Sequence, residues 1–324
     1  MKLAISRKHI PLLSTIAVCV LLYATGSVLY YNQNFFSLQV FVNFFSDNSF
    51  LGIVAVGMTF VILSGGIDLS VGSVLALSSI LAAVLMKSWG VPPPFAIVAV
   101  LAVGTALGLG MGCVIHFFGL PPFIVTLAGM FFARGLGFII HIESMSIDNA
   151  FYRTASDLAV PLAGARVPIT AIVFLAVLAA AVYVSTWTVF GRNVYAVGGN
   201  EEAAMLMGIP VGRTKLLVYA LSGFCSALAG VVFTIYGSSG NPSAGVGMEL
   251  DAIAAVVVGG TLLTGGVGYV FGTLIGVLIF GIIQTGISFQ GTLSSWWTRV
   301  VIGVLLLLFI LLQKLFARPA ARAT

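Results

Sequence analysis

Charged side chains are so scarce in this chain that each of them is a candidate for function. Among 324 residues there are nine acids and fourteen bases. Charges of both signs gather in the segment 198–215, which reads GGNEEAAMLMGIPVGRTK. These residue types suit docking on another surface, because paired alanines let that surface approach closely and methionine adapts to an irregular pocket.

The same segment predicts a short helix that would hold these groups. Asn200 is a good N-cap, and Glu201 and Glu202 fall in the first turn, where the helix dipole favours negative charge. Gly208 can end the helix in a left-handed conformation, and Pro210 prevents its resumption. A helix of about two turns is too short to cross a bilayer. Its apolar side carries Ala203, Ala204, Leu206 and Met207.

Two ionisable residues are expected at membrane depth. Asp68 is the only acid between Asp47 and Glu143, and it either caps a helix starting at Leu69 or lines a solute path. The strong preference of Asp for N-caps favours the cap. Arg134 lies within an apolar run and needs an acceptor or a wet cavity. Asp68 and Glu143 are its possible partners.

Neutral polar residues, glycines and aromatic residues near the ends of apolar runs complete the candidates for a solute path. Trp296 and Trp297 would form an interfacial belt, although an aromatic ring also stacks on the apolar face of a sugar. Since the set includes almost no charge, it suits an uncharged, polyhydroxylated solute rather than an amino acid or a phosphate. The candidates are Asn48, Ser64, Gly65, Gly66, Asp68, Arg134, Asn241, Gln284, Trp296 and Trp297.

The usual signatures of enzymes and ATP-binding proteins are missing from the sequence. It contains no Walker A loop, no HExxH and no GxSxG, and His9, His116 and His141 are far apart. We therefore expect no catalytic residue, no metal site and no cofactor bound by this chain. The three cysteines lie inside apolar runs and are interpreted as packing residues.

The composition places these residues in a membrane. With 60% hydrophobic residues and a mean hydropathy of +1.16, the chain is too apolar for a soluble domain of its size. We predict an all-α, polytopic protein with about ten transmembrane helices, forming a single domain over residues 1–324. The net charge of +5 reflects bases at span ends and not nucleic-acid binding. The predicted spans are 10–31, 49–64, 70–87, 94–117, 122–141, 168–188, 216–237, 250–264, 268–288 and 297–314.

The distribution of bases predicts the orientation. With an even number of spans both termini lie on one side of the membrane, and the other side holds Lys87, Arg153 and Arg166. Because bases favour the cytoplasmic side, both termini and a loop at about 190–215 are expected there, and a loop at about 142–167 faces outward. The outer loop is either a solvated connector or a surface for a soluble partner. The bases on the cytoplasmic side are Lys2, Arg7, Lys8, Arg192, Arg213, Lys215, Lys314, Arg318 and Arg322.

A weak internal repeat is visible at a spacing of 200 residues. LSGGI at 63–67 matches LTGGV at 263–267, and the dipeptide at 72–73 (GS) matches that at 272–273 (GT). Each copy interrupts a pair of apolar runs with a Gly-Gly break. Paired, Gly-interrupted spans in two halves of a transporter commonly point to its translocation path, unless two glycine-rich turns merely coincide.

Several segments resemble the ribose-type branch of the ABC sugar permeases. They follow the family's order and cover nearly the whole chain. The run Glu202-Ala203-Ala204, followed by Gly208, resembles the Glu-Ala-Ala coupling loop of ABC importers, although taken alone it would fit a plain connector equally well. Met207 departs from the longer consensus of other ABC importers, which often has Asp at this position. The ribose-type branch generally departs from that consensus here. The segments are AVGMTFVILSGGIDLSVGSV at 55–74, FIVTLAGMFFARG at 123–135, YAVGGN at 195–200 and ELDAIAAVVVGGTLLTGGVG at 249–268.

The resemblance implies a permease of the bacterial inner membrane that moves a monosaccharide by alternating access and does no covalent chemistry. Its partners would be a second permease subunit as a heterodimer, an ATP-binding subunit carrying ATP and Mg²⁺, a periplasmic sugar-binding protein and membrane lipid. The residues that couple to the ATP-binding subunit would be Asn200, Glu201, Glu202, Ala203, Ala204, Leu206, Met207 and Gly208.

The resemblance also suggests a substrate. GTLSSWWT at 291–298 is most similar to permeases of galactofuranose importers, which makes galactofuranose the expected sugar. Ribose, xylose and autoinducer-2 importers share the other motifs and are alternatives. An ion-coupled secondary sugar carrier is a further alternative, although such carriers usually have several buried acids and here only Asp68 qualifies.

Overall fold

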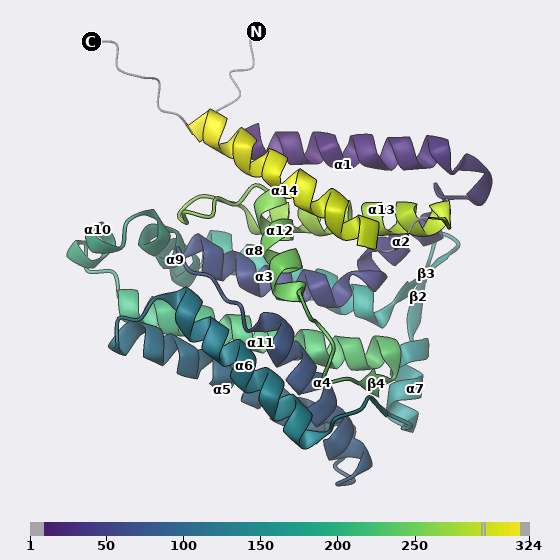
Figure 1. Ribbon diagram of the computed structural model, residues 1–324, viewed down its shortest axis with the longest axis horizontal. Coiled ribbons are helices and arrows are strands. Elements are labelled where there is room, and N and C mark those ends of the chain that lie inside the picture. Colours follow the sequence, from purple (N-terminus) through teal and green to yellow (C-terminus); the bar gives the residue numbers. More distant parts are fainter. Residues whose placement is uncertain (1–9, 293, 295, 318–324) are drawn as a thin grey trace.

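The computed structural model describes residues 10–292, 294 and 296–317, most of which form a bundle of helices (Figure 1). Lys2, Arg7, Lys8, Arg318 and Arg322, which entered the predicted orientation, lie outside the described residues. The helices are α1 (Ile10–Leu29), η2 (Tyr31–Gln33), α2 (Leu38–Asp47), α3 (Ser49–Leu63), α4 (Val71–Lys87), α5 (Pro93–Phe117), α6 (Pro122–Ile140), α7 (Ala150–Asp157), α8 (Ile169–Trp187), α9 (Val189–Gly199), α10 (Glu201–Leu206), α11 (Val211–Gly237), α12 (Met248–Val258), α13 (Val270–Gln290) and α14 (Trp296–Ala317).

Two short antiparallel ladders depart from the all-α expectation. β1 (Met145–Ser146) pairs with β4 (Ser239–Gly240), which fastens the connector after α6 to the segment after α11. β2 (Ala159–Leu162) pairs with β3 (Ala165–Pro168) around a two-residue turn. Both turn residues, at 163 and 164, have positive φ, as tight hairpin turns require.

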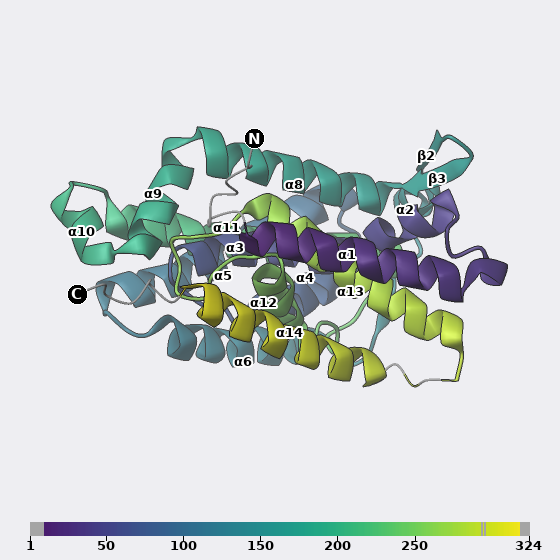
Figure 2. The same cartoon turned by 90° about the horizontal axis from the view of Figure 1, so that it is seen from above.

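Helices α3 and α4 form the centre of the molecule. In α3 every residue except Phe50 is buried, which explains why its sequence is apolar on all sides. Helix α11 packs against α3, α4 and α5, and α1 lies along α13. In Figure 1, α1 and α14 cover one side of this centre and α5 and α6 the other, and Figure 2 shows α8 along one edge. Helices α5, α6 and α8 leave most of their apolar surface uncovered, as lipid-facing helices do.

Small residues allow α5 and α11 to pack closely. Gly104, Gly108 and Gly112 lie on one face of α5, where an added Cβ would meet backbone or Cβ atoms of α11. Gly223 of α11 faces Gly104 and Gly108 in return. Their small-xxx-small spacing is typical of close helix packing in membranes, whereas Gly110 has nothing within 4 Å of an added Cβ.

Five helices, α5, α6, α8, α11 and α13, are long and apolar enough to cross a membrane. Helices α2 and α3 would form a sixth span if they are taken together as one helix bent by 56°. Within the described residues α1, α4 and α14 contribute shorter apolar helices. These helices fall in nine of the ten predicted ranges. The sequence reading missed α2 and α9, and it placed the start of α11 five residues late, at 216 instead of Val211.

The predicted span 250–264 is wrong as a complete crossing. Helix α12 has only 11 residues. Such a helix measures about 16 Å, roughly half of the hydrocarbon core. It stops at a glycine pair, in which Gly259 is the C-cap residue and Gly260 has φ of +94°, and the chain stays non-helical until α13. Its last residues are fully buried, so the half-length helix ends inside the protein.

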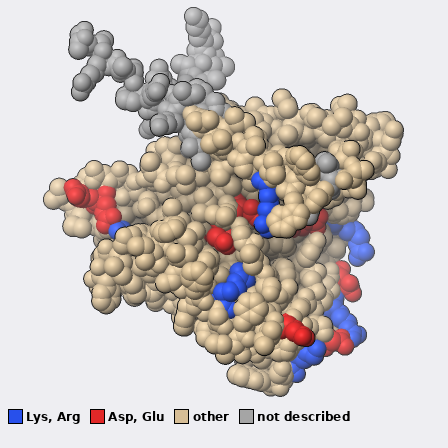
Figure 3. All heavy atoms as spheres, viewed as in Figure 1, with Lys and Arg blue, Asp and Glu red and all other residues tan. Residues whose placement is uncertain are grey.

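The two ends of the molecule carry different elements. Helix α10 lies at one end of the long axis and α7 with the β2–β3 hairpin at the other (Figures 1 and 2); we call them the α10 end and the α7 end. On the face shown in Figure 3, acidic side chains gather at the α10 end and charges of both signs at the α7 end. A central group of charges interrupts the broad uncharged surface between them.

Candidate functional site

Helix α10 forms as the sequence predicted. The Asn200 side chain accepts a hydrogen bond from the Ala203 amide at 2.8 Å, which confirms the N-cap. Glu201 and Glu202 lie in the first turn. Gly208 has φ of +77° and ends the helix. Short-range capping is therefore enough to define this element.

One side of α10 is fastened to the rest of the protein. Ala204 is fully buried in a small cluster with Val197 of α9 and Val211 of α11. The Lys215 ammonium lies 2.7 Å from each carboxylate oxygen of Glu201. These two contacts tie the helix to both of its neighbours in the chain, so α10 is held in a fixed position on α9 and α11.

The other side of α10 is apolar and uncovered. Leu206 is 90% exposed, and Met205 and Met207 are 61% and 69% exposed. The predicted single apolar side is wrong in one respect, because Ala204 points inward while Leu206 and Met207 point outward. We call Met205, Leu206 and Met207 the apolar knob. Exposed apolar side chains that gather in one place are a feature of interaction surfaces.

The repeat brings its two Gly-Gly breaks into contact. The Gly266 amide donates to the Leu63 carbonyl at 2.9 Å, and a Cβ added to Gly265 would lie only 2.8 Å from the Gly65 nitrogen. We call residues 63–66 and 264–266 the glycine junction. Next to it, the hydroxyls of Thr59 and Thr273 are 2.7 Å apart. The repeat is thus a contact between two halves of the structure.

The junction holds three of the predicted path residues, Ser64, Gly65 and Gly66. The Ser64 hydroxyl donates to the Val61 carbonyl at 2.8 Å, so it is turned toward its own helix. Gly65 has φ of +83°, a left-handed conformation that disfavours any residue with a Cβ. All three therefore shape the backbone and present no side-chain group to a solute in this conformation.

Asp68 is fully buried beside the junction. Its carboxylate accepts from the amide of Ser70 at 2.9 Å, from the hydroxyl of Ser70 at 2.6 Å and from the hydroxyl of Ser222 on α11 at 2.7 Å. The helix begins at Val71 with Ser70 as its N-cap residue, so the expected start at Leu69 is wrong by two residues. Asp68 stabilises this turn and joins it to α11.

Arg134 has neither of the partners that the sequence suggested. Its guanidinium donates to the carbonyls of Pro242 and Ala244 at 2.8 and 2.6 Å, and Glu249 attracts it electrostatically. Asn241 lies in the same loop, where its side chain accepts from the amide two residues on. Carbonyls satisfy this cation because the loop between α11 and α12 turns them inward. Both candidates therefore shape a loop.

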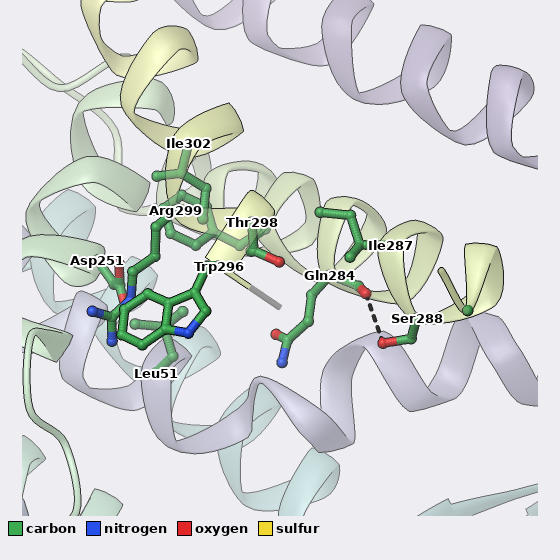
Figure 4. A pocket seen from close by; sticks show the side chains of 11 residues that line it. Leu51, Asp251, Gln284, Ile287, Ser288, Trp296, Thr298, Arg299 and Ile302 are labelled. Carbon is green, nitrogen blue, oxygen red and sulfur yellow. Dashed lines mark hydrogen bonds between the residues drawn. The ribbon is translucent and has the colours of Figure 1, made fainter. Parts of the chain in front are cut away.

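Gln284 and Trp296 line one cavity together. It has a volume of about 460 Å³ and lies between α3, α12, α13 and α14. In Figure 4 the side-chain amide of Gln284 extends from α13 toward the cavity. The hydroxyl of Ser288, on the same helix, donates to the backbone carbonyl of Gln284 at 3.0 Å. Thr298 adds a second hydroxyl to the lining. Donors and acceptors thus face the space from more than one helix.

Asp251 and Arg299 line the same cavity and were missed by the sequence analysis. The Arg299 guanidinium lies over the Trp296 ring, 4.8 Å from its centroid, and Asp251 of α12 attracts it. The i, i+3 spacing of Trp296 and Arg299 was the available signal. This cavity therefore carries one acid and one base, whose charges balance each other.

A second cavity, of about 440 Å³, is also lined by Gln284 and Ser288 of α13. Asn48 contributes to it, although the Asn48 amide is mostly buried and donates to the Phe44 carbonyl at 3.0 Å. Asp47 and Tyr236 also line this cavity, and the Tyr236 hydroxyl donates to the Asp47 carboxylate at 3.2 Å. The cavities thus collect Asn48, Gln284 and Trp296 from the predicted set.

The connector between α6 and α8 forms the α7 end. Arg153 pairs with Asp148, and this hydrogen bond raises the pKa of the Arg153 guanidinium above its usual value. Tyr152 is buried, and its hydroxyl lies 3.1 Å from that of Thr234 on α11. The connector is therefore anchored on the bundle, with charges on its outer surface.

Comparison with known proteins identifies the group to which the chain belongs. The family described as the permease component of branched-chain amino acid transport systems matches residues 40–310. The chain belongs to this family. No solved structure matches it significantly.

Relatives of known name cover the permease almost completely. It is 50% identical over 309 residues to the inner membrane ABC transporter permease protein YjfF of Escherichia coli, covering 95% of this chain and 93% of the relative. It is 36% identical to the fructose import permease protein FruG of Bifidobacterium longum, with 96% and 92% covered. It is 40% identical to the ribose import permease protein RbsC of Escherichia coli, with 93% and 92% covered.

These relatives and the apolar helices agree on location. The permease is a multi-pass protein of the bacterial inner membrane.

Proposed function

We propose that this permease is the membrane-spanning subunit of an ATP-driven importer for a monosaccharide. The observation that carries the proposal is α10, whose apolar knob is exposed while its other side is fastened by Ala204 and Glu201. An exposed apolar surface on a rigidly held element suits a partner better than a mere connector. The names of the relatives, which are ABC, ribose import and fructose import permeases, support it.

In this proposal the partners supply what the chain lacks. An ATP-binding subunit would receive α10 in a cleft and hydrolyse ATP with Mg²⁺, a second permease subunit would complete the pore, and a periplasmic sugar-binding protein would dock at the α7 end. The knob and the docked sugar-binding protein would then bias one two-state structure from opposite ends. This chain would bind no cofactor and catalyse no covalent step.

Purification and reconstitution test the proposal. Extraction of the tagged permease in mild detergent should co-purify an ATP-binding subunit, and liposomes containing the assembled system should take up sugar only when ATP is supplied. Import by the isolated chain, driven by a proton or sodium gradient, would instead establish the ion-coupled carrier. Such carriers depend on buried acids in their spans, whereas Asp68 is occupied by three hydrogen bonds.

The proposed substrate is galactofuranose, with ribose, xylose and autoinducer-2 as alternatives. The cavity between α3, α12, α13 and α14 supports a sugar, because it combines the Gln284 amide, two hydroxyls, the Trp296 ring and a balanced pair of charges. Sugars bind through such mixed hydrogen bonding and aromatic contact. The cavity need only tolerate the solute, since specificity would reside in the soluble binding protein.

Uptake by variants tests the substrate path. Gln284→Ala or Trp296→Ala should lower the rate of galactofuranose uptake by the assembled system about tenfold, the effect of losing one good contact. The affinity of the sugar-binding protein for galactofuranose should stay unchanged. Trp297→Ala is the matched control, because Trp297 is 51% exposed and does not line the cavity.

Competition with unlabelled ribose and xylose decides between the sugars. If the system imports ribose and excludes galactofuranose, the proposed sugar is wrong and the importer remains. If the Gln284 and Trp296 variants transport as fast as the control variant, the cavity is not on the path.

A further inference from the structure

Helix α9 ends where the two Gly-Gly breaks meet. Gly198, near its last turn, packs so closely that an added Cβ would overlap the Leu63 carbonyl and lie 2.7 Å from the Gly266 nitrogen. The next residue, Gly199, is exposed, and a Cβ added to Gly266 would lie 2.6 Å from the Gly199 Cα. Backbone atoms of α9 therefore contact both segments of the glycine junction, with no side chain between them.

Two side chains of α9 strengthen this attachment. The Tyr195 hydroxyl donates to the Gly268 carbonyl at 3.0 Å, which joins α9 to the loop between α12 and α13. Phe190 stacks on Phe60 of α3, with ring centroids 6.1 Å apart. Helix α9 is thus bound to α3 in one half of the repeat and to the α12–α13 loop in the other.

Helix α10 follows directly and is bound to α9 and α11. Ala204 packs on Val197 of α9, and Glu201 pairs with Lys215 of α11. A force applied to the apolar knob therefore reaches Gly198 through packed groups. Packed protein interiors have little slack, so such a contact moves its neighbours with it.

We propose that Gly198 is a positioning residue that links α10 to the glycine junction, so that a displacement of α10 moves both halves of the permease together. Its role in transport rests on the proposed function, whereas the link itself is a property of this chain. Any side chain at position 198 would push α9 away from Leu63 and Gly266. The hydrogen bond from Gly266 to Leu63 would then weaken.

Hydrogen exchange on the purified chain tests the link without any partner. The Gly266 amide should exchange slowly in the native protein, and at least about tenfold faster in Gly198→Ala, equivalent to about 1.4 kcal/mol. Gly199→Ala is the matched control, because its Cβ would have nothing within 4 Å. Native exchange rates for Gly266 in Gly198→Ala would overturn the proposal.

Tyr195→Phe decides the matter if Gly198→Ala disturbs the whole fold, which faster exchange in α5 and α11 would reveal. This variant removes one hydroxyl and its hydrogen bond to Gly268. It should speed exchange across residues 262–268 by a smaller factor and leave α5 and α11 unchanged. Unchanged exchange across 262–268 would count against the link.

The assembled importer in liposomes tests the consequence. Gly198→Ala should lower the sugar transported per ATP hydrolysed at least about tenfold while ATP hydrolysis continues, and Gly199→Ala should match the native ratio. If Gly198→Ala exchanges faster yet transports at the native ratio, the inference is wrong and the importer stands. If the native chain binds no ATP-binding subunit, the proposed function fails, and the exchange experiment still decides whether the link exists.

Discussion

At the scale of single residues, Asp68 and Arg134 find their hydrogen-bond partners in backbone groups and hydroxyls. Asp68 accepts three hydrogen bonds and Arg134 donates to two carbonyls. The two residues do not pair with each other. In a low-dielectric interior such bonds hold a group firmly, because leaving it unpaired is costly. Both therefore fix the positions of turns on which the junction and the α11–α12 loop depend.

Substitutions of Asp68 distinguish a structural role of this residue from a role in transport. Asp68→Ala should lower the unfolding temperature in detergent, since each donor left buried without a partner costs about 1–3 kcal/mol. Asp68→Asn keeps an acceptor for Ser70, and the Ser222 hydroxyl can rotate to accept from the new amide. Asn should therefore be close to native in unfolding temperature and in uptake. Native stability with lost uptake in Asp68→Asn would assign the charge to the solute path.

At the scale of elements, the shape of α10 and its exposure have different causes. Its shape comes from local caps, whereas its exposure comes from how α9 and α11 hold it. The Glu201–Lys215 pair is partly exposed, so it adds orientation more than stability. Leu206 is 90% exposed, so this side chain of the knob contributes little to the fold of the chain.

Changes in α10 should uncouple transport without unfolding the protein. Leu206→Glu and Glu202→Lys alter only exposed groups, so both should reduce capture of the ATP-binding subunit while the unfolding temperature stays native. Trp89→Glu is a control at another exposed apolar residue, after α4. Co-purification and ATP-dependent uptake measure the effect. Native capture by both α10 variants would reduce the segment to a connector.

Gly208 tests the end of the same helix. Gly208→Val places a β-branched residue at φ of +77°, which costs about 1–2 kcal/mol in local strain and should displace the knob. Gly208→Asn tolerates this conformation better and should keep more of the native coupling. The measurement is sugar transported per ATP hydrolysed. Equal ratios for the Val and Asn variants would show that the left-handed turn is not required.

At the scale of the whole molecule, α10 and α7 lie at opposite ends. Because bases favour the cytoplasmic side, we predict that α10 faces the cytoplasm and α7 the periplasm. In a variant without the three native cysteines, Ser156→Cys on α7 should react with a membrane-impermeant maleimide in intact spheroplasts. Met205→Cys on α10 should react only after the membrane is opened. The reverse pattern would invert the topology.

Elements that depend on local interactions were predictable from the sequence. Asn200 and Gly208 define α10 through hydrogen bonds and a dihedral angle within a few residues, and both predictions are confirmed. The spacing of the glycines in α5 is a local signal of close packing, although it does not identify their partner on α11. Nine of the predicted ranges contain an apolar helix, and five of these helices are long enough to cross a membrane, because lipid requires a long apolar helix wherever a chain crosses.

Contacts between distant segments were decided only by the tertiary structure. The partners of Arg134 are carbonyls 108 and 110 residues away, and nothing in the sequence marks a carbonyl as turned inward. The half-length of α12 was hidden, because its apolar run continues through a glycine pair that hydropathy does not register. The repeat indicated two equivalent breaks, but only the packing of α9 on Leu63 and Gly266 joined them to each other and to α10. Sequence encodes local geometry and burial, whereas these contacts depend on which surfaces meet once the helices have packed.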